Sequence, residues 1–241
     1  MACAHRGMHV EGDARMRVIA VVCQKGGSGK TTAATELAVL SVRNGYATVV
    51  FDVDPQASAT IWGDDRGGDP PQVVPAQAPR LPIMLAQAEK QGAEMVVIDT
   101  GPSADSAALA AAKAADIILV PAKTTVRDLK ALGPTLKTIM DVVPNKRVVV
   151  VLSMIPVRGA VVEESVRYLA EANIEVCPIR LHQRADFYNG LGVGRASVEW
   201  EPRGKAAFEA TALWQWLCTQ LGMPEHTPHR VSEAVGARIS V

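Results

Sequence analysis

Aromatic side chains are scarce in this sequence, and neither sign of charge is in excess. Phe, Trp and Tyr make up 4% of the 241 residues, whereas hydrophobic residues of all kinds make up 48%. A core built mainly from Val, Ile, Leu and Ala is typical of buried parallel strands covered by helices, so the composition favours an α/β fold. The 25 basic and 25 acidic side chains balance, so nucleic acid or an acidic membrane would have to be bound through a local patch.

The four cysteines, Cys3, Cys23, Cys177 and Cys218, are too far apart to form a Cys-x-x-Cys pair. Their spacing therefore indicates neither a zinc site nor an iron–sulfur cluster, and we expect reduced, mostly buried thiols. No apolar run reaches the roughly 20 residues that a membrane-spanning helix needs, and the first residues lack the apolar segment of a signal peptide. We therefore expect a cytoplasmic protein without a membrane span.

Short β-branched runs alternate with Ala-rich helical stretches along most of the chain. This alternation predicts a mostly parallel, twisted sheet with helices on both faces, joined by right-handed crossovers. Strands are expected at 18–23, 47–53, 95–99, 116–121, 147–153 and 174–178, and helices at 30–44, 103–115, 125–141 and 161–172.

Three segments depart from this alternation. Residues 63–82, with their run of Gly, Asp and Pro, are predicted to form a long loop that leads into a helix at 83–91. Residues 1–15 and 223–241 are expected to be flexible extensions, which assigns the folded domain to residues 16–222.

The strongest motif is Lys25-Gly26-Gly27-Ser28-Gly29-Lys30-Thr31-Thr32, which lies where a predicted strand ends and a predicted helix begins. Gly26, Gly27 and Gly29 allow successive N–H groups to face one anion, and the helix adds its positive N-terminal end. Lys30 supplies a charge to the β- and γ-phosphates, and the Thr31 hydroxyl is placed to bind Mg²⁺. The motif predicts a P-loop NTPase that binds ATP with Mg²⁺; the alternative is a Gly-rich turn with an incidental lysine.

Lys25 distinguishes this loop, because an ordinary P-loop needs no second lysine at its start. The pattern KGGxGKTT resembles the deviant Walker A motif of the ParA/MinD family of ATPases. The resemblance implies a nucleotide-dependent homodimer in which two subunits enclose ATP, and Lys25 reaches across to the phosphates of the partner like an arginine finger. The alternative is a solvated loop lysine.

Three carboxylates fit this resemblance. Asp52 and Asp54 close the second predicted strand, near the carboxyl edge at which α/β sheets bind ligands. The resemblance implies that Asp54 positions or activates the attacking water and that Asp52 holds the water shell of the metal; an Asp-Pro turn is the alternative. Asp99 ends the apolar run 95–99 and would be the Walker B carboxylate that binds the Mg²⁺ shell. After it, Thr100-Gly101 stands where the family more often has Cys-Pro or Ala-Pro.

The residues around the base and the DNA-facing residues rest on the resemblance alone. It places the adenine near the ends of later strands, at Ser153, Met154, Pro178 and Arg180. It also implies a DNA-facing basic patch, formed by Arg180, Arg184, Arg195, Arg203 and Lys205. A solvated basic helix surface accounts for these five residues nearly as well.

The resemblance extends from residue 16 to about residue 221 and matches most closely the short plasmid-partition ParA proteins of the ParF type. It implies a DNA-segregation ATPase whose ATP-bound dimer coats nucleoid DNA nonspecifically, until a centromere-binding adaptor of the ParB or ParG kind stimulates hydrolysis and release. One alternative is a MinD-like regulator that cycles on membranes, for which residues 230–241 would have to form a basic amphipathic helix. Another is a small-molecule enzyme such as a cobyrinate synthase; a nitrogenase-type reductase is disfavoured because no cysteine is placed to share a cluster.

Overall fold

A seven-stranded sheet runs through the middle of the computed structural model, which describes residues 15–102, 106–157 and 161–223. The strand order is β3-β2-β4-β1-β5-β6-β7, and every pairing is parallel. The strands are β1 (Arg17–Val21), β2 (Thr48–Asp52), β3 (Gln72–Pro75), β4 (Met95–Asp99), β5 (Ile117–Ala122), β6 (Arg147–Leu152) and β7 (Glu175–Val176). The predicted α/β class with a parallel sheet is therefore confirmed.

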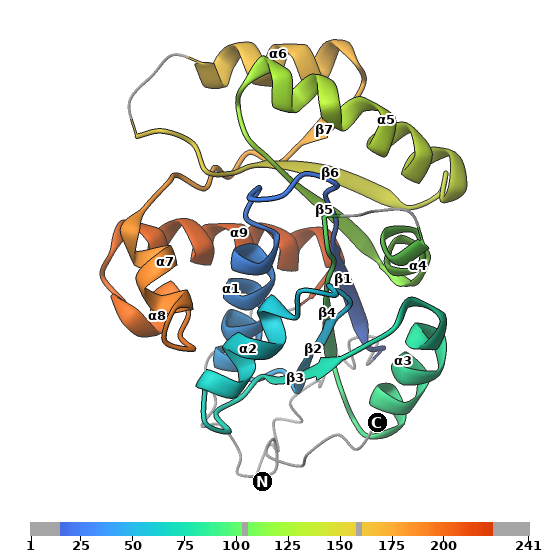
Figure 1. Ribbon diagram of the computed structural model, residues 1–241, viewed down its shortest axis with the longest axis vertical. Helices are drawn as coiled ribbons and strands as arrows, with labels where there is room; N and C mark the ends of the chain where they lie inside the picture. Colours follow the sequence, from blue (N-terminus) through green and yellow to red (C-terminus); the bar gives the residue numbers. More distant parts are fainter. Residues whose placement is uncertain (1–14, 103–105, 158–160, 224–241) are drawn as a thin grey trace, which may run out of the picture.

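Helices cover both faces of the sheet (Figure 1). On one face lie α3 (Leu81–Lys90), α4 (Ser106–Ala114), α5 (Val126–Val142) and α6 (Val161–Glu171), and on the other α1 (Lys30–Arg43), α2 (Ser58–Asp65), α7 (Ala185–Leu191), α8 (Ser197–Trp200) and α9 (Lys205–Leu221). Alternate residues of one strand enter different cores: Val18 and Ala20 pack with α3 to α6, whereas Ile19 and Val21 pack with α1 and α9. Burial on both faces explains why the strands are continuously apolar.

The prediction of a long loop over residues 63–82 is wrong. Helix α2 continues to Asp65, β3 adds an edge strand to β2, and the 3₁₀ helix η1 (Ala78–Arg80) leads directly into α3. Glycine at position 63 allows α2 to pack on β3, because a Cβ there would lie 2.6 Å from Cγ2 of Val73. The Gly and Pro residues thus shape tight connections between short elements.

Two other parts of the chain also differ from the prediction. β7 has two residues, Glu175–Val176, where a strand over 174–178 was expected. The segment from Ala185 onward was interpreted only as a basic pattern, yet it forms α7, α8 and α9. The predicted extensions 1–15 and 223–241 fall almost entirely outside the described residues and stay predictions.

The register of the sheet brings three loops together. Asp99, the last residue of β4, is level with Val21 at the end of β1 and with Asp52 at the end of β2. The loops that follow these three strands therefore leave the sheet at one edge. This edge is the carboxyl end of the parallel strands, where α/β proteins bind their ligands.

Candidate functional site

The loop between β1 and α1 has the backbone of a phosphate-binding loop. Gly27 and Gly29 adopt φ values of 66° and 86°, a left-handed conformation that favours glycine. Lys30 begins α1, and its buried side chain donates from Nζ to the carbonyl of Lys25 at 3.3 Å. From the end of β6, Ser153 Oγ donates to the Ser28 carbonyl at 2.6 Å and so supports the loop from below.

Thr31 and Asp99, the two residues predicted to bind Mg²⁺ directly or through its waters, meet next to this loop. Thr31 Oγ1 donates to Oδ2 of Asp99 at 2.7 Å, and Asp99 is completely buried. The pKa of Asp99 is raised to about 7, because the effect of burial outweighs the opposing effect of the hydrogen bond from Thr31. Oδ1 of Asp99 has no hydrogen-bond partner among the described residues.

A buried carboxylate with one free oxygen fits a hydrated divalent cation, because such a cation favours the charged form and Mg²⁺ keeps several of its waters. Thr31 and Asp99 would hold the ion, which would neutralise phosphate charge when bound.

Asp52, the third carboxylate of the site, makes different contacts. Its Oδ1 accepts from the Asp54 N–H at 3.0 Å, and its Oδ2 accepts from the N–H and hydroxyl of Thr60 at 2.7 and 2.8 Å. Asp52 therefore organises the loop after β2, and its part in the metal shell stays a prediction.

Asp54 lies half-buried on the loop after β2, next to Gly101 in the loop after β4. Its Oδ1 accepts from the Gln56 N–H at 2.9 Å. A Cβ on Gly101 would lie 2.9 Å from the same oxygen, so glycine at this position gives Asp54 its space. Thr100 donates its hydroxyl to the Val21 carbonyl at 2.9 Å. The Thr100-Gly101 pair, which departs from the more usual family pattern, thus ties the loop after β4 to β1 and leaves space for Asp54.

An open cavity of about 270 Å³ lies over the phosphate loop. It is lined by Gly26, Gly27, Gly29, Lys30, Thr31 and Thr32 of the loop, by Asp54, Gln56, Ser58 and Pro102, and by Met154, Tyr188 and Leu191. Asp54 and Lys30 thus share one cavity, as a nucleotide site requires.

Of the residues predicted near the base, the structure brings Met154 to the cavity, where the Tyr188 hydroxyl donates to its Sδ at 3.0 Å. Pro178 and Arg180 are exposed and are not among the described residues of the lining; Arg180 instead pairs with Glu163 at 3.4 Å. Tyr188 was missed because a single tyrosine in the sequence carries no signal for a nucleotide.

The side chain of Lys25 lies against helix α5. Its ammonium forms an ion pair with the buried carboxylate of Asp128 on α5, and Lys25 does not line the cavity. Asp128 is held in turn by Thr125, the N-cap of α5, which donates to its Oδ2 at 2.6 Å. Within one chain, the second lysine of the loop therefore contacts helix α5 and not the phosphate site.

The predicted DNA-facing residues fall into two groups. Arg184 pairs with Glu209 at 2.5 Å and Arg180 with Glu163, so their charges are compensated locally. Arg195, Arg203 and Lys205 are exposed, and no ion pair is seen for them among the described residues. The three predicted DNA-facing residues without an ion pair in the described part of the chain therefore lie between the end of α7 and the start of α9.

A phosphate loop after the central strand, a buried carboxylate at the end of the neighbouring strand and a parallel sheet together define a P-loop NTPase. The family model described as CbiA, the CobQ/CobB/MinD/ParA nucleotide binding domain, matches residues 19–191. The chain belongs to this family of P-loop ATPases, and the predicted resemblance is confirmed.

Individual relatives agree with this assignment. The maintenance of carboxysome distribution protein A of Gloeobacter kilaueensis is 33% identical over 211 residues, which cover 85% of this chain and 94% of the relative. A probable plasmid-partitioning protein ParA of Thermus thermophilus is 28% identical over 159 residues, which cover 51% of this chain and 49% of the relative. The structure of MinD from Pyrococcus horikoshii complexed with Mg-ADP superposes with a TM-score of 0.65 at 17% identity, covering 86% of this chain and 98% of MinD. ATP and Mg²⁺ are thus confirmed as cofactors at the level of the family.

Proposed function

We propose that this chain is a DNA-segregation ATPase that binds MgATP, forms an ATP-enclosing dimer on nucleoid DNA and leaves the DNA after hydrolysis. The observation that carries the proposal is the position of Lys25. It belongs to the phosphate loop, yet it pairs with Asp128 outside its own cavity. A lysine that binds the phosphates of a partner subunit accounts for this arrangement. Such a lysine need not line the nucleotide cavity of its own chain; it has only to leave Asp128 on α5 when the dimer forms.

In this cycle, ATP shifts the population from monomer to dimer, and hydrolysis reverses the shift. A basic adaptor protein of the ParB or ParG kind, bound to the cargo, would stimulate hydrolysis and set the direction of movement. The protein would act in the cytoplasm, on the nucleoid. The names of the relatives include both a plasmid-partitioning and a carboxysome-distribution protein, so the proposal concerns the mechanism and not one cargo.

The substitution Lys25→Ala tests the role of this lysine across a dimer interface. The variant should keep MgATP binding, because Lys30, Thr31 and Asp99 remain, but it should lose ATP-dependent dimers and stimulated hydrolysis. Light scattering with and without MgATP, together with a phosphate-release assay, measures both effects. Normal stimulated hydrolysis by the variant would contradict the trans role.

This substitution also leaves the buried Asp128 carboxylate without its cation, which is destabilising on general grounds. The double variant Lys25→Ala/Asp128→Asn removes that charge and serves as the control for stability. Asp128→Asn alone keeps the lysine and removes its partner in the chain. If dimers are lost in both variants that lack Lys25 and not in Asp128→Asn, the loss belongs to the lysine.

DNA binding should depend on ATP, ignore base sequence and weaken steeply with salt. Three exposed basic residues per subunit, Arg195, Arg203 and Lys205, would give a dimer about six phosphate contacts and a log–log salt slope of about −5. The pair Arg203→Glu/Lys205→Glu should flatten the slope and weaken binding. Fluorescence anisotropy with random duplex DNA at several salt concentrations measures both.

The matched control is Lys90→Glu/Lys113→Glu, which makes the same change of charge at exposed positions on α3 and α4, on the other face of the sheet. It should leave the salt slope as it is in the wild type. DNA binding that needs no nucleotide, or that salt does not affect, would overturn the proposal.

Two alternatives then remain. A membrane-cycling regulator would need a basic amphipathic helix at residues 230–241, which lie outside the described part of the chain. None of the described helices is long and apolar enough to cross a membrane. Cosedimentation with liposomes against DNA separates this function from DNA segregation. For a small-molecule ligase, a small acid and not DNA should stimulate the ATPase.

A further inference from the structure

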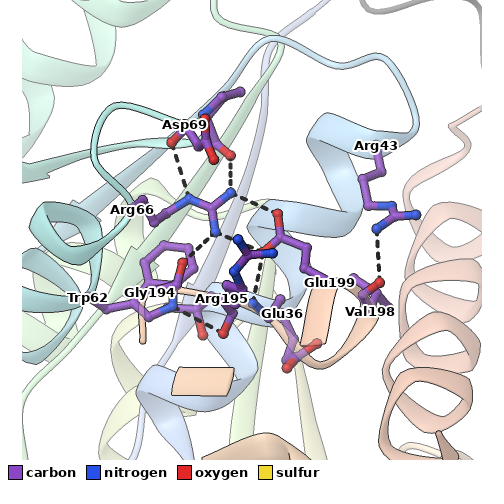
Figure 2. Close-up of polar contacts among 12 residues, drawn as sticks. Glu36, Arg43, Trp62, Arg66, Asp69, Gly194, Arg195, Val198 and Glu199 are labelled. Carbon is purple, nitrogen blue, oxygen red and sulfur yellow. Dashed lines mark hydrogen bonds and ion pairs between the residues drawn. The ribbon is translucent and has the colours of Figure 1, made fainter. Parts of the chain in front are cut away.

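Arg66, which follows α2, is almost completely enclosed, and each N–H group of its guanidinium has an acceptor (Figure 2). Nε donates to the Asp69 carbonyl at 3.1 Å, and one terminal nitrogen donates to the Gly194 carbonyl and to Oε2 of Glu199, both at 2.8 Å. The other donates to the Pro70 carbonyl and to Oε1 of Glu199 at 2.9 Å. The arginine thus joins the end of α2 to Gly194 and to α8, more than 120 residues further along the chain.

The surroundings show how closely this contact is built. The guanidinium carbon lies 4.7 Å from the centre of the buried Trp62 ring, and Trp62 Nε1 donates to the Arg195 carbonyl at 3.4 Å. Gly194 has a φ of 69°, and a Cβ there would lie 2.6 Å from the Asp65 carbonyl carbon. Although burial alone would raise the pKa of Glu199, the hydrogen bonds from Arg66 and from the Ala196 N–H lower it.

The start of α2 is tied to the loop after β2, which carries Asp54. Thr60 donates its N–H and its hydroxyl to Oδ2 of Asp52, and Oδ1 of Asp52 accepts the N–H of Asp54. α2 is therefore anchored at its start to the loop that carries Asp54. Asp52 thus links the position of α2 to that of this loop.

Gly194 and α8 are likewise connected to a wall of the nucleotide cavity. Helix α7 ends at Leu191, three residues before Gly194, and supplies Tyr188 and Leu191 to the cavity lining. On its other side, α8 is fixed to α1, because the buried Glu36 carboxylate accepts from the N–H and hydroxyl of Ser197 at 2.6 and 2.8 Å. The Asp54 loop and α7 line one cavity. They are connected through α2, which is bonded to Asp52 at its start and, through Arg66 at its end, to Gly194 after α7.

We propose that Arg66 is a positioning residue for ATP hydrolysis: through α2 it fixes the distance between the Asp54 loop and the α7 wall of the nucleotide site. This role goes beyond the proposed function, since it holds whatever the cargo is. Arginine is required because its five donors lie in one plane that also stacks on Trp62, whereas a lysine has three donors around a point charge.

The substitution Arg66→Lys keeps the charge and leaves at least two of the five acceptors unserved. At a temperature at which the variant is folded by circular dichroism, kcat/KM for ATP should fall about tenfold or more, since misplacement of about 1 Å is sufficient to cost 100-fold. Both walls move, so KM should rise and kcat should fall. A folded variant with the kcat and KM of the wild type would overturn the proposal.

The matched control is Arg43→Lys. Arg43 also holds α8, by donating to the Val198 carbonyl at 2.9 Å, but it extends from α1, and no hydrogen bond or ion pair joins it to α2 in the part of the chain described. Arg43 is exposed, and conservative substitutions on the surface usually have small effects, so kcat/KM of this variant should stay within about twofold of the wild type. Equal losses in both variants would mean that a general loosening of α8, and not α2, is responsible.

A double-variant cycle separates positioning from simple loss of contacts. Thr60→Val removes a hydroxyl near the start of α2, and Thr60 and Arg66 have no hydrogen-bond partner in common among the described residues. Independent losses in kcat/KM would multiply. If both substitutions act through α2, the double variant Arg66→Lys/Thr60→Val should lose little more kcat/KM than the more impaired of the two single variants. Losses that multiply would contradict the role of α2.

Discussion

Replacing Lys30 with alanine is expected to abolish ATP binding. Lys30 is the one cationic side chain in the described lining of the cavity, and it is already buried against the loop at the Lys25 carbonyl. Wild-type protein at an ATP concentration of 100 Kd should gain about 2.7 kcal/mol of unfolding free energy. The variant should gain none, which a thermal melt with and without MgATP measures.

Lys113→Ala is the control for this experiment, since it removes an exposed lysine on α4. It should be stabilised by MgATP as much as the wild type is. A Lys30→Ala protein with the same gain in melting temperature as the wild type would refute the phosphate site itself. In that case the mechanism proposed above would have no nucleotide to act on.

Replacing Asp54 with alanine is expected to hold the protein in its ATP state. The phosphate loop, Thr31 and Asp99 remain, so nucleotide should bind, but the attacking water would lose the carboxylate that is proposed to orient it. General-base catalysis contributes about 10²- to 10⁴-fold, so hydrolysis should fall by that factor. ATP-dependent dimers should then accumulate, and size-exclusion chromatography with light scattering in MgATP detects them.

Asp54→Asn separates the chemistry of the carboxylate from its place in the loop. The asparagine oxygen can still accept the hydrogen bond that Gln56 N–H donates to Asp54, but an amide is no general base. It should trap dimers as alanine does. A monomeric Asp54→Ala protein in MgATP, or rapid hydrolysis by Asp54→Asn, would count against the water-activating role.

The parts of the site that could be predicted are those encoded by consecutive residues. The phosphate loop occupies positions 25–32, and the register that brings Asp99 beside it follows from two apolar strands of a parallel sheet. Cys23, Cys177 and Cys218 are buried thiols, as expected, while Cys3 lies outside the described residues. Local chemistry and strand pattern were sufficient for these features.

Contacts between distant segments could not be predicted in this way. The pair of Lys25 with Asp128 and the bonds of Arg66 to Glu199 join residues that no local pattern relates. β3 was hidden because its four residues lie among Pro and Gly, which also signal loops. Pro178 and Arg180 were placed at the base by analogy, whereas the packing of α7 brings Tyr188 and Leu191 to the cavity instead.

The two edges of the sheet also bear on how this protein meets copies of itself. β3 has four residues and ends at Pro75, and β7 has two. Edges this short, one of them closed by a residue without an N–H group, offer little template for adding a strand from another chain, which is a common route to irreversible aggregation. If the chain gathers on DNA as proposed, its copies would therefore meet mainly at the nucleotide-bearing end, where the proposed cycle separates them again once phosphate has left.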